Sequence, residues 1–197
     1  RGRWTRQLAV DSNQRVAGAS LVRPALFLIG MMGAGKSTVG RLLARRCGFD
    51  FVDCDRELEA RSGVSVATIF ELEGEAGFRR REASLIDELT QRSRIVLATG
   101  GGAVLDADNR QHLRSRGLVI YLRASVDEIL RRTQKDRARP LLQTEDRRGR
   151  VAKLLAEREA LYEEIAQVTV QSSAGNPNKL VAKLMQDEQV AAVLDRA

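Results

Sequence analysis

Short apolar runs alternate with segments of helical period along most of this chain. Each run is four or five residues long or shorter, which is typical of a buried strand and too short for a helix. The predicted strands are Ala25–Ile29, Phe51-Val52, Ile95–Ala98, Leu118–Leu122 and Val168–Val170. Strands that alternate with helices indicate an α/β fold around a parallel sheet, with ligands at the carboxyl ends of the strands.

The segments between these runs carry the signals of helices. Val39, Leu42 and Leu43 form a stripe that predicts a helix ending at Gly48. Ser125 and Glu128 form a capping box. Asn176-Pro177 is an N-cap followed by proline at the first helical position. Further helices are expected after Ser65, across residues 78–89 and around residues 154–161.

The chain of 197 residues is long enough for one domain with short extensions. Residues 1–23 mix Arg, Gln, Ser, Asn and Gly without a period, so we expect a disordered leader there. The single domain is expected to span residues 24–190 and to be followed by a tail at 191–197. Within it, the polar and basic stretch at about 134–149 resembles a mobile lid.

Composition excludes several classes of protein. No apolar run approaches the ~18 residues of a membrane-spanning helix. Two cysteines and one histidine are too few for a disulfide scaffold or a zinc cage, and they fit a reducing cytoplasm, where we place the protein.

The net charge of +7 raises the question of nucleic-acid binding. The excess lies mainly in two places, residues 1–23 and residues 131–150, and aromatic residues make up only 4% of the chain. A nucleic-acid binder more often has a basic face with interleaved aromatics. A local basic segment suits a nucleotide triphosphate, so we expect neither nucleic acid nor membrane as a partner.

The segment Gly30–Thr38, with the sequence GMMGAGKST, is a P-loop between a predicted strand and a predicted helix. Its glycines allow backbone N–H groups to surround phosphate oxygens at a helix N-terminus. Lys36, which we expect to be exposed in its loop, would reach the β- and γ-phosphates, and the Ser37 hydroxyl would bind Mg²⁺. The chain is therefore predicted to bind ATP or GTP.

Asp53 and Asp55 follow the second strand, and strand alternation would place both on one side with Cys54 on the other. Two carboxylates there can hold hydrated Mg²⁺ and orient an acceptor hydroxyl. The alternative is that Asp55 only caps a helix at Arg56–Arg61.

Three further features have both a functional and a plain interpretation. One of the arginines at 79–81 can turn inward to bind a carboxylate or phosphate, although a solvated helix face is the default. Gly100-Gly101-Gly102 makes room for a ligand or is a simple turn. Arg158, between two acidic residues on a helix, is a surface arginine by default.

Taken in order, these residues resemble the shikimate kinase family. The resemblance runs from about Leu26 to Leu184 and rests on GMMGAGKST, FVDCD, GFRRRE, ATGGGAV, RRTQKDRARPLL and REALY. It implies a three-layer α/β/α fold like that of P-loop nucleoside monophosphate kinases, with a five-stranded parallel sheet and a mobile lid. It also implies transfer of the γ-phosphate of ATP to the 3-hydroxyl of shikimate, with Mg²⁺, by a protein that we expect to be a monomer.

The resemblance also implies roles for individual residues. Lys36, Asp55 and Arg139 would be catalytic, with Asp55 as the candidate base and Arg139 as the lid arginine. ATP would be bound by Gly33, Ala34, Gly35, Lys36, Ser37, Thr38, Arg132 and Arg139. Shikimate would be bound by Asp55, Arg79, Gly101 and Arg158, the two arginines holding its carboxylate. Mg²⁺ would be held by Ser37 and, through water, by Asp53.

Gly175 departs from the family, which often has a longer side chain at this place near adenine. Two other functions stay open. A gluconate-type sugar-acid kinase would keep the P-loop and lid but would not need Asp-x-Asp, Phe-Arg and the three glycines together. A nucleotide-binding regulator that has lost catalysis would be expected to lose its acceptor residues first.

Overall fold

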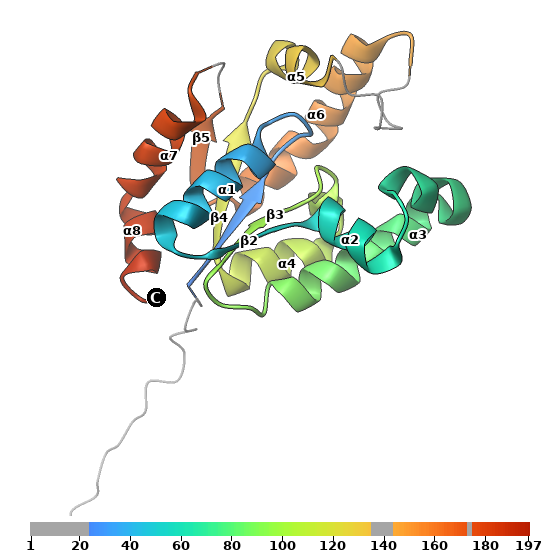
Figure 1. The fold of residues 1–197 in the computed structure, drawn as a ribbon. Coiled ribbons are helices and arrows are strands. Elements are labelled where there is room, and N and C mark those ends of the chain that lie inside the picture. Colours follow the sequence, from blue (N-terminus) through green and yellow to red (C-terminus); the bar gives the residue numbers. More distant parts are fainter. Residues whose placement is uncertain (1–23, 135–143, 173–174) are drawn as a thin grey trace, which may run out of the picture.

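The computed structural model describes residues 24–134, 144–172 and 175–197, and it has the α/β class expected from the sequence (Figure 1). Five strands form one parallel sheet in the order β2-β3-β1-β4-β5. The strands are β1 (Ala25–Ile29), β2 (Asp50–Asp53), β3 (Ile95–Ala98), β4 (Leu118–Arg123) and β5 (Val168–Gln171). The expected leader at 1–23 and residues 135–143 of the expected lid, including Arg139, lie outside the described residues.

Helices cover both faces of the sheet and complete the three layers. They are α1 (Lys36–Cys47), α2 (Cys54–Ser62), α3 (Val66–Leu89), the 3₁₀ helix η1 (Ala103–Leu105), α4 (Ala107–Arg116), α5 (Val126–Thr133), α6 (Arg147–Ile165), α7 (Pro177–Met185) and α8 (Glu188–Leu194). Helices α1, α7 and α8 lie on one face, and α3, α4 and α6 lie on the other (Figure 1). None of the helices in the described ranges combines the length and apolarity needed to cross a membrane.

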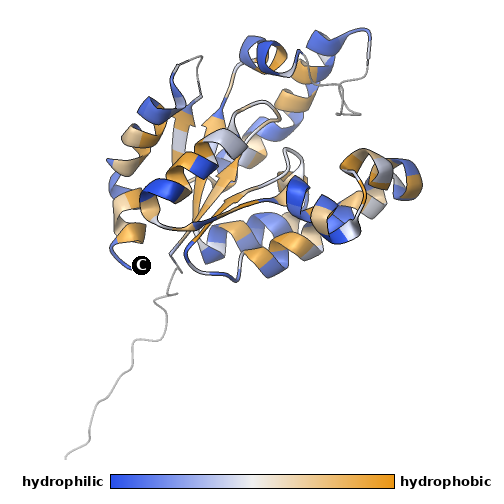
Figure 2. Ribbon diagram, viewed as in Figure 1, coloured by the Kyte–Doolittle hydropathy of each residue, from blue (hydrophilic) through white to orange (hydrophobic). Residues whose placement is uncertain are grey.

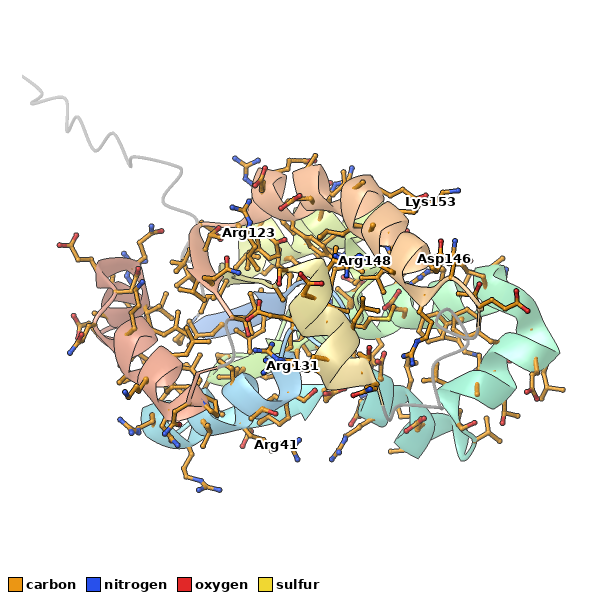
Figure 3. The ribbon with its side chains drawn as sticks, turned by 90° about the horizontal axis from the view of Figure 1, so that it is seen from above. Arg41, Arg123, Arg131, Asp146, Arg148 and Lys153 are labelled. Atoms are coloured by element: carbon orange, nitrogen blue, oxygen red, sulfur yellow. The ribbon has the colours of Figure 1, made fainter. Side chains whose placement is uncertain are left out.

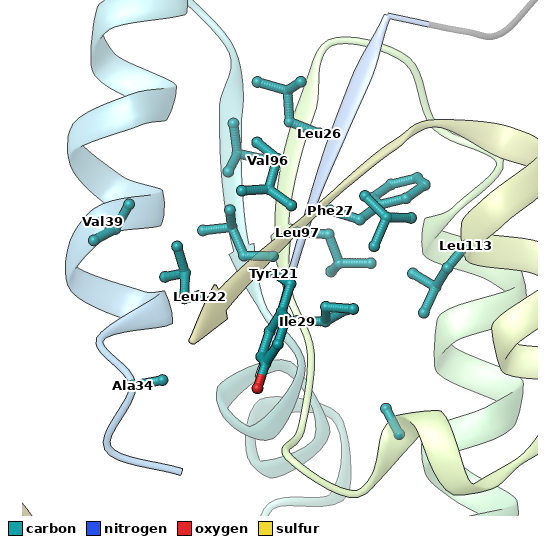
Figure 4. Packing of buried hydrophobic residues seen from close by; sticks show 14 of the residues in the cluster. Leu26, Phe27, Ile29, Ala34, Val39, Val96, Leu97, Leu113, Tyr121 and Leu122 are labelled. Atoms are coloured by element: carbon teal, nitrogen blue, oxygen red, sulfur yellow. The ribbon is translucent and has the colours of Figure 1, made fainter. Parts of the chain in front are cut away.

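The core lies between these layers. All five residues of β1 are buried, without the alternation of a half-exposed strand, because both faces of the sheet are covered. Val39 of α1 packs on one side of the central strands and Leu113 of α4 on the other (Figure 4). Figure 2 shows the same division: the central strands β1, β3 and β4 are mainly hydrophobic, whereas the helices carry both hydrophobic and hydrophilic residues.

The local signals in the sequence agree with the structure at several helix ends. Gly48 ends α1 in the left-handed conformation, with φ 68°. The capping box of Ser125 and Glu128 starts α5. The side chain of Asn176 caps α7, and Pro177 is its first residue. These ends depend on contacts within a few residues, which is why the sequence predicts them.

Two elements differ from the expectation. The helices expected after Ser65 and across 78–89 join into α3, with a kink at Gly74, whose φ of 68° is not helical. Residues 191–197, expected to form a tail, instead begin inside α8, where Val190 and Val193 are buried. Helix α8 packs against β4, and Asp187 caps its first turn, so the folded domain continues past residue 190.

Candidate active site

The P-loop joins the end of β1 to the start of α1. Gly33 and Gly35 have φ values of 74° and 93°, in a region that residues with a Cβ rarely adopt. Gly35 is the N-cap of α1 and has no side chain to occupy the end of the helix. The first N–H groups of α1 therefore remain available to an anion.

Lys36 lies along this loop and does not extend into solvent. Its ammonium donates to the Gly30 carbonyl at 2.7 Å and to the Met31 carbonyl at 2.9 Å. Lys36 is 8% exposed, so the expectation of an exposed loop lysine is wrong. The loop carbonyls thus partner the ammonium charge, and the Met31 carbonyl also accepts from the Ala34 N–H at 3.1 Å.

Ser37 and Asp53 connect the P-loop to the end of β2. The Ser37 hydroxyl donates to Oδ2 of Asp53 at 2.5 Å. The other oxygen of Asp53 accepts from the Arg56 N–H at 3.5 Å and caps α2. Parallel pairing of Asp53 with Ala98 of β3 fixes the position of this carboxylate at the carboxyl edge of the sheet.

Asp53 and Asp55 do not lie together through the strand alternation that the sequence predicted. Strand β2 ends at Asp53, and α2 begins at Cys54, so strand alternation does not reach Asp55. The residue that caps α2 is Asp53, so the alternative role of Asp55 as a cap is also wrong. Both carboxylates nevertheless line one cavity, because Asp55 lies in the first turn of the helix that starts there.

This cavity of about 310 Å³ brings together most of the phosphate-binding residues expected from the sequence. It is lined by Met32, Gly33, Gly35, Lys36, Ser37, Thr38, Asp53, Asp55, Thr99, Gly101 and Arg132. Cationic, hydroxyl and carboxylate groups therefore share one space at the carboxyl ends of the strands.

Arg132 separates this cavity from a second one. Its guanidinium donates to the carbonyls of Gly33 and Ala34, at 3.1 and 3.2 Å, and to both the hydroxyl and the carbonyl of Ser172. The second cavity, of about 450 Å³, lies between the start of α1, the end of α5 and the start of α7, and Gly175 and Asn176 line it. Figure 3 looks down on this end of the molecule, with Arg131 of α5 above α1. A nucleoside attached to phosphates in the P-loop would extend here.

Only Arg79 of the three arginines at 79–81 turns inward. Its Nη1 donates to Glu82 at 2.6 Å and its Nη2 to Glu75 at 3.1 Å. The side chain of Arg79 is 21% exposed, whereas Arg80 and Arg81 are exposed. A Cβ on Gly102 would overlap the Arg79 guanidinium, so the glycine is what lets this arginine approach the Gly100–Gly102 turn.

Arg158 contacts the same turn from the opposite part of the chain. It is 3% exposed, so its default interpretation as a surface arginine is wrong. Its Nη1 donates to the Gly101 carbonyl at 3.3 Å, and the Tyr162 hydroxyl donates to that carbonyl as well. The structure thus brings Arg79, Gly101 and Arg158, expected as one binding set, into one neighbourhood.

Glu82 is a site residue that the sequence reasoning did not single out. It is 1% exposed, and a Cβ on Gly100 would overlap its carboxylate and lie 3.5 Å from Oδ1 of Asp55. Burial raises the pKa of the Glu82 carboxyl, and the nearby Asp55 charge adds to the rise, against the attraction of Arg79 and Arg158. Its spacing of three residues from Arg79 on a helix was the available signal.

Cys54 is fully buried beside these carboxylates. Burial, with the charges of Glu82, Asp55 and Asp53, raises the pKa of its thiol well above the ordinary value. A neutral buried thiol packs and is a poor nucleophile.

A magnesium ion fits the oxygen groups at the loop end of the cavity. The Ser37 hydroxyl and the Asp53 carboxylate are hard oxygen ligands that already lie together, and Mg²⁺ usually takes one or two such groups with waters and substrate phosphates. In the described parts of the chain, no group of three or more His, Cys, Asp and Glu could hold a metal without a substrate.

Comparison with known proteins gives a consistent result. Residues 32–189 match the family model described as shikimate kinase. The chain is 58% identical over 160 residues to a shikimate kinase of Bordetella pertussis, an alignment that covers 81% of this chain and 76% of the relative.

Solved structures resemble this chain to different degrees for the two kinase hypotheses, shikimate kinase and gluconate-type kinase. A shikimate kinase from Acinetobacter baumannii, solved in complex with shikimate, matches with a TM-score of 0.82 and 46% identity over 83% of this chain and 92% of that one. A gluconokinase from Sinorhizobium meliloti matches with a TM-score of 0.55 and 18% identity over 89% of this chain and 93% of that one, a likeness that shows a shared fold alone.

Proposed function

The chain belongs to the shikimate kinase family of ATP-dependent phosphotransferases. We propose that it transfers the γ-phosphate of ATP to the 3-hydroxyl of shikimate, with the residue roles given below. The observation that carries the proposal is the single cavity in which Lys36 and Ser37 face Asp55 and Gly101. A phosphate donor at one end and a hydroxyl acceptor at the other would meet inside it.

At the donor end, the P-loop residues from Gly33 to Thr38 bind the phosphates of ATP through backbone N–H groups. Lys36 exchanges its loop carbonyls for the β- and γ-phosphate oxygens, since an ammonium interacts more strongly with an anion than with a neutral carbonyl. Mg²⁺, held by Ser37 and through water by Asp53, would neutralise phosphate charge when bound. Arg132, already fixed to the loop, borders the nucleoside in the second cavity.

At the acceptor end, Asp55 orients the attacking hydroxyl and takes its proton. The bond between the γ-phosphorus and the leaving oxygen of ADP breaks as the new bond to the 3-oxygen forms. Arg79 and Arg158 bind the carboxylate of shikimate beside Gly101, since a guanidinium has five N–H donors and matches the geometry of a carboxylate. Arg139 is proposed to stabilise the transferring phosphate from the lid.

We also propose that the protein acts as a monomer in the cytoplasm. Of the described large hydrophobic residues, only Val64, Leu72 and Leu105 are exposed, which gives little apolar surface for a stable dimer. The cytoplasmic placement rests on the low cysteine content, two in 197 residues.

A coupled ADP-release assay tests the assignment, with shikimate, quinate and gluconate compared in parallel. We expect ADP release that depends on shikimate and Mg²⁺ and that is far slower with the other two acids. Release with gluconate and none with shikimate would overturn the acceptor assignment. Binding of ATP without turnover of any acceptor would favour the non-catalytic regulator.

A further inference from the structure

The Gly101 carbonyl receives two hydrogen-bond donors from one helix. Arg158 and Tyr162 are four residues apart on α6 and therefore lie on the same face of it. The Tyr162 hydroxyl and Nη1 of Arg158 both donate to this carbonyl, which has two lone pairs to accept them. Tyr162 thus donates to the same carbonyl as Arg158, an arginine proposed to bind shikimate.

The hydrophobic core determines where this hydroxyl lies. Tyr162 is fully buried, and its ring stacks on that of Tyr121 in β4, with centroids 5.0 Å apart and planes 24° apart. Burial raises the pKa of the Tyr162 phenol, so the group stays protonated and can donate. In Figure 4, Tyr121 points toward the end of the sheet at which Ala34 of the P-loop lies.

The turn that receives this bond has backbone hydrogen bonds to the carbonyls of Gly100 and Gly102, whereas the Gly101 carbonyl is held by the two side chains of α6. Three consecutive glycines have no side chains, and each loses more conformational freedom on ordering than any other residue. A Cβ on Gly101 would lie 3.1 Å from the Met32 backbone nitrogen, so the turn also lies against the P-loop. Because a peptide unit is planar and trans, holding the Gly101 carbonyl also sets the direction of the Gly102 N–H.

We propose that Tyr162 is a positioning residue for the acceptor: by holding the Gly101 carbonyl, it orders the glycine turn and the Arg158 guanidinium before shikimate binds. This inference rests on the proposed function of the site. The tyrosine itself touches neither substrate nor the reacting atoms. Its effect is to reduce the ordering that binding would otherwise require.

The test compares Tyr162→Phe with Tyr121→Phe. Each change removes one phenolic oxygen from the same ring stack, but only the Tyr162 hydroxyl donates to the glycine turn, whereas the Tyr121 hydroxyl lies near the Arg123 side chain. For Tyr162→Phe we expect KM for shikimate to rise about three- to tenfold, the range set by losing one buried hydrogen bond. KM for ATP and kcat should stay within about twofold, and Tyr121→Phe should resemble the wild type in all three constants.

Amide hydrogen exchange gives a readout that does not need activity. Exchange at Gly101 and Gly102 should be faster in Tyr162→Phe than in the wild type and unchanged in Tyr121→Phe. An equal rise in both KM values with a lower melting temperature, or failure of Tyr162→Phe to fold, would assign Tyr162 a structural role and overturn the proposal. Unchanged exchange and an unchanged KM for shikimate would overturn it too. A wild type inactive with shikimate would instead count against the proposed function.

Discussion

Arg79 and Glu82 form a short ion pair beside the Gly100–Gly102 turn of the proposed acceptor site. Nη1 of the arginine lies 2.6 Å from Oε2 of the glutamate, which is 1% exposed, and the two residues are three apart on α3. The other carboxylate oxygen of Glu82 is buried without a hydrogen bond in the described structure. Arg79 is therefore the hydrogen-bond partner of a carboxylate that is almost fully buried, and the pair fixes the position of the Arg79 guanidinium.

Glu82→Gln should weaken binding of shikimate without abolishing turnover. The amide keeps the shape of the side chain but loses the charge that holds Arg79. Hydrogen bonds to charged groups contribute about 1.5–3 kcal/mol, and losing part of one predicts a roughly tenfold rise in KM for shikimate. Steady-state kinetics at saturating MgATP measures this, with KM for ATP as the internal reference.

Glu75→Gln is the matched control for that change. Glu75 is also bonded to Arg79, at 3.1 Å, but its side chain is 54% exposed. Exposed pairs contribute only about 0.2–1 kcal/mol, so KM for shikimate should change by less than about fivefold. If the two variants behave alike, burial of the Glu82 pair has no special importance for the acceptor.

The stability of the protein should depend on pH through Glu82. Burial raises the pKa of this carboxyl above its ordinary value, so the folded state binds the proton more strongly than the unfolded state. Its contribution to stability is then complete below the ordinary pKa and is lost as the pH rises through the folded-state pKa. The free energy of unfolding can be measured by urea titration for the wild type and Glu82→Gln across this pH range. As the pH rises, the wild type should lose stability relative to the variant. A constant difference would contradict the raised pKa.

Lys36→Ala should lower kcat by about 10²–10³-fold, the scale of losing one preorganised donor to a developing charge. The variant also leaves the Gly30 and Met31 carbonyls without this ammonium, so a modest fall in melting temperature is expected. Circular dichroism melts accompany the kinetics. A variant that is unfolded at assay temperature would make Lys36 a structural residue first.

The sequence predicts the frame of the fold well because that frame depends on local chemistry. Strands Ala25–Ile29 and Ile95–Ala98 have the expected bounds, since each is an uninterrupted apolar run. Helix α8 was not predicted, although Asp187 is an N-cap and Val190, Val193 and Leu194 have helical spacing, because the segment is only seven residues long and its stability comes from packing against the domain.

The site was harder to predict where it depends on contacts between residues that are far apart in the sequence. Spacing indicates that Arg158 and Tyr162 share a helix face, but it does not indicate that this face meets Gly101, 61 residues before Tyr162. Burial of Glu82 likewise follows from the packing of α3 and not from its own neighbours. The P-loop residues were easier to place from the sequence because they lie within one contiguous segment between β1 and α1.

Arg158→Lys should act mainly on the binding of shikimate. A carboxylate contact is made in both the ground and transition states, so its loss appears in KM. Lysine keeps the charge but lacks the planar fork, and the loss of a bidentate contact predicts a roughly ten- to hundredfold rise in KM. Arg80→Lys, at an exposed position of α3, is the control. An unchanged KM for shikimate would remove Arg158 from the set of carboxylate ligands.

Asp55→Asn separates chemistry from binding at the opposite end of the substrate. Asparagine keeps the shape and most hydrogen bonding of the aspartate, but it cannot take the proton of the attacking hydroxyl. A general base contributes about 10²–10⁴-fold, so kcat should fall by that order while KM for shikimate changes much less. The same steady-state assay measures both, with Arg158→Lys as the contrasting pattern. Near-normal kcat would limit Asp55 to binding, and the proton would then pass to a phosphate oxygen late in the transfer.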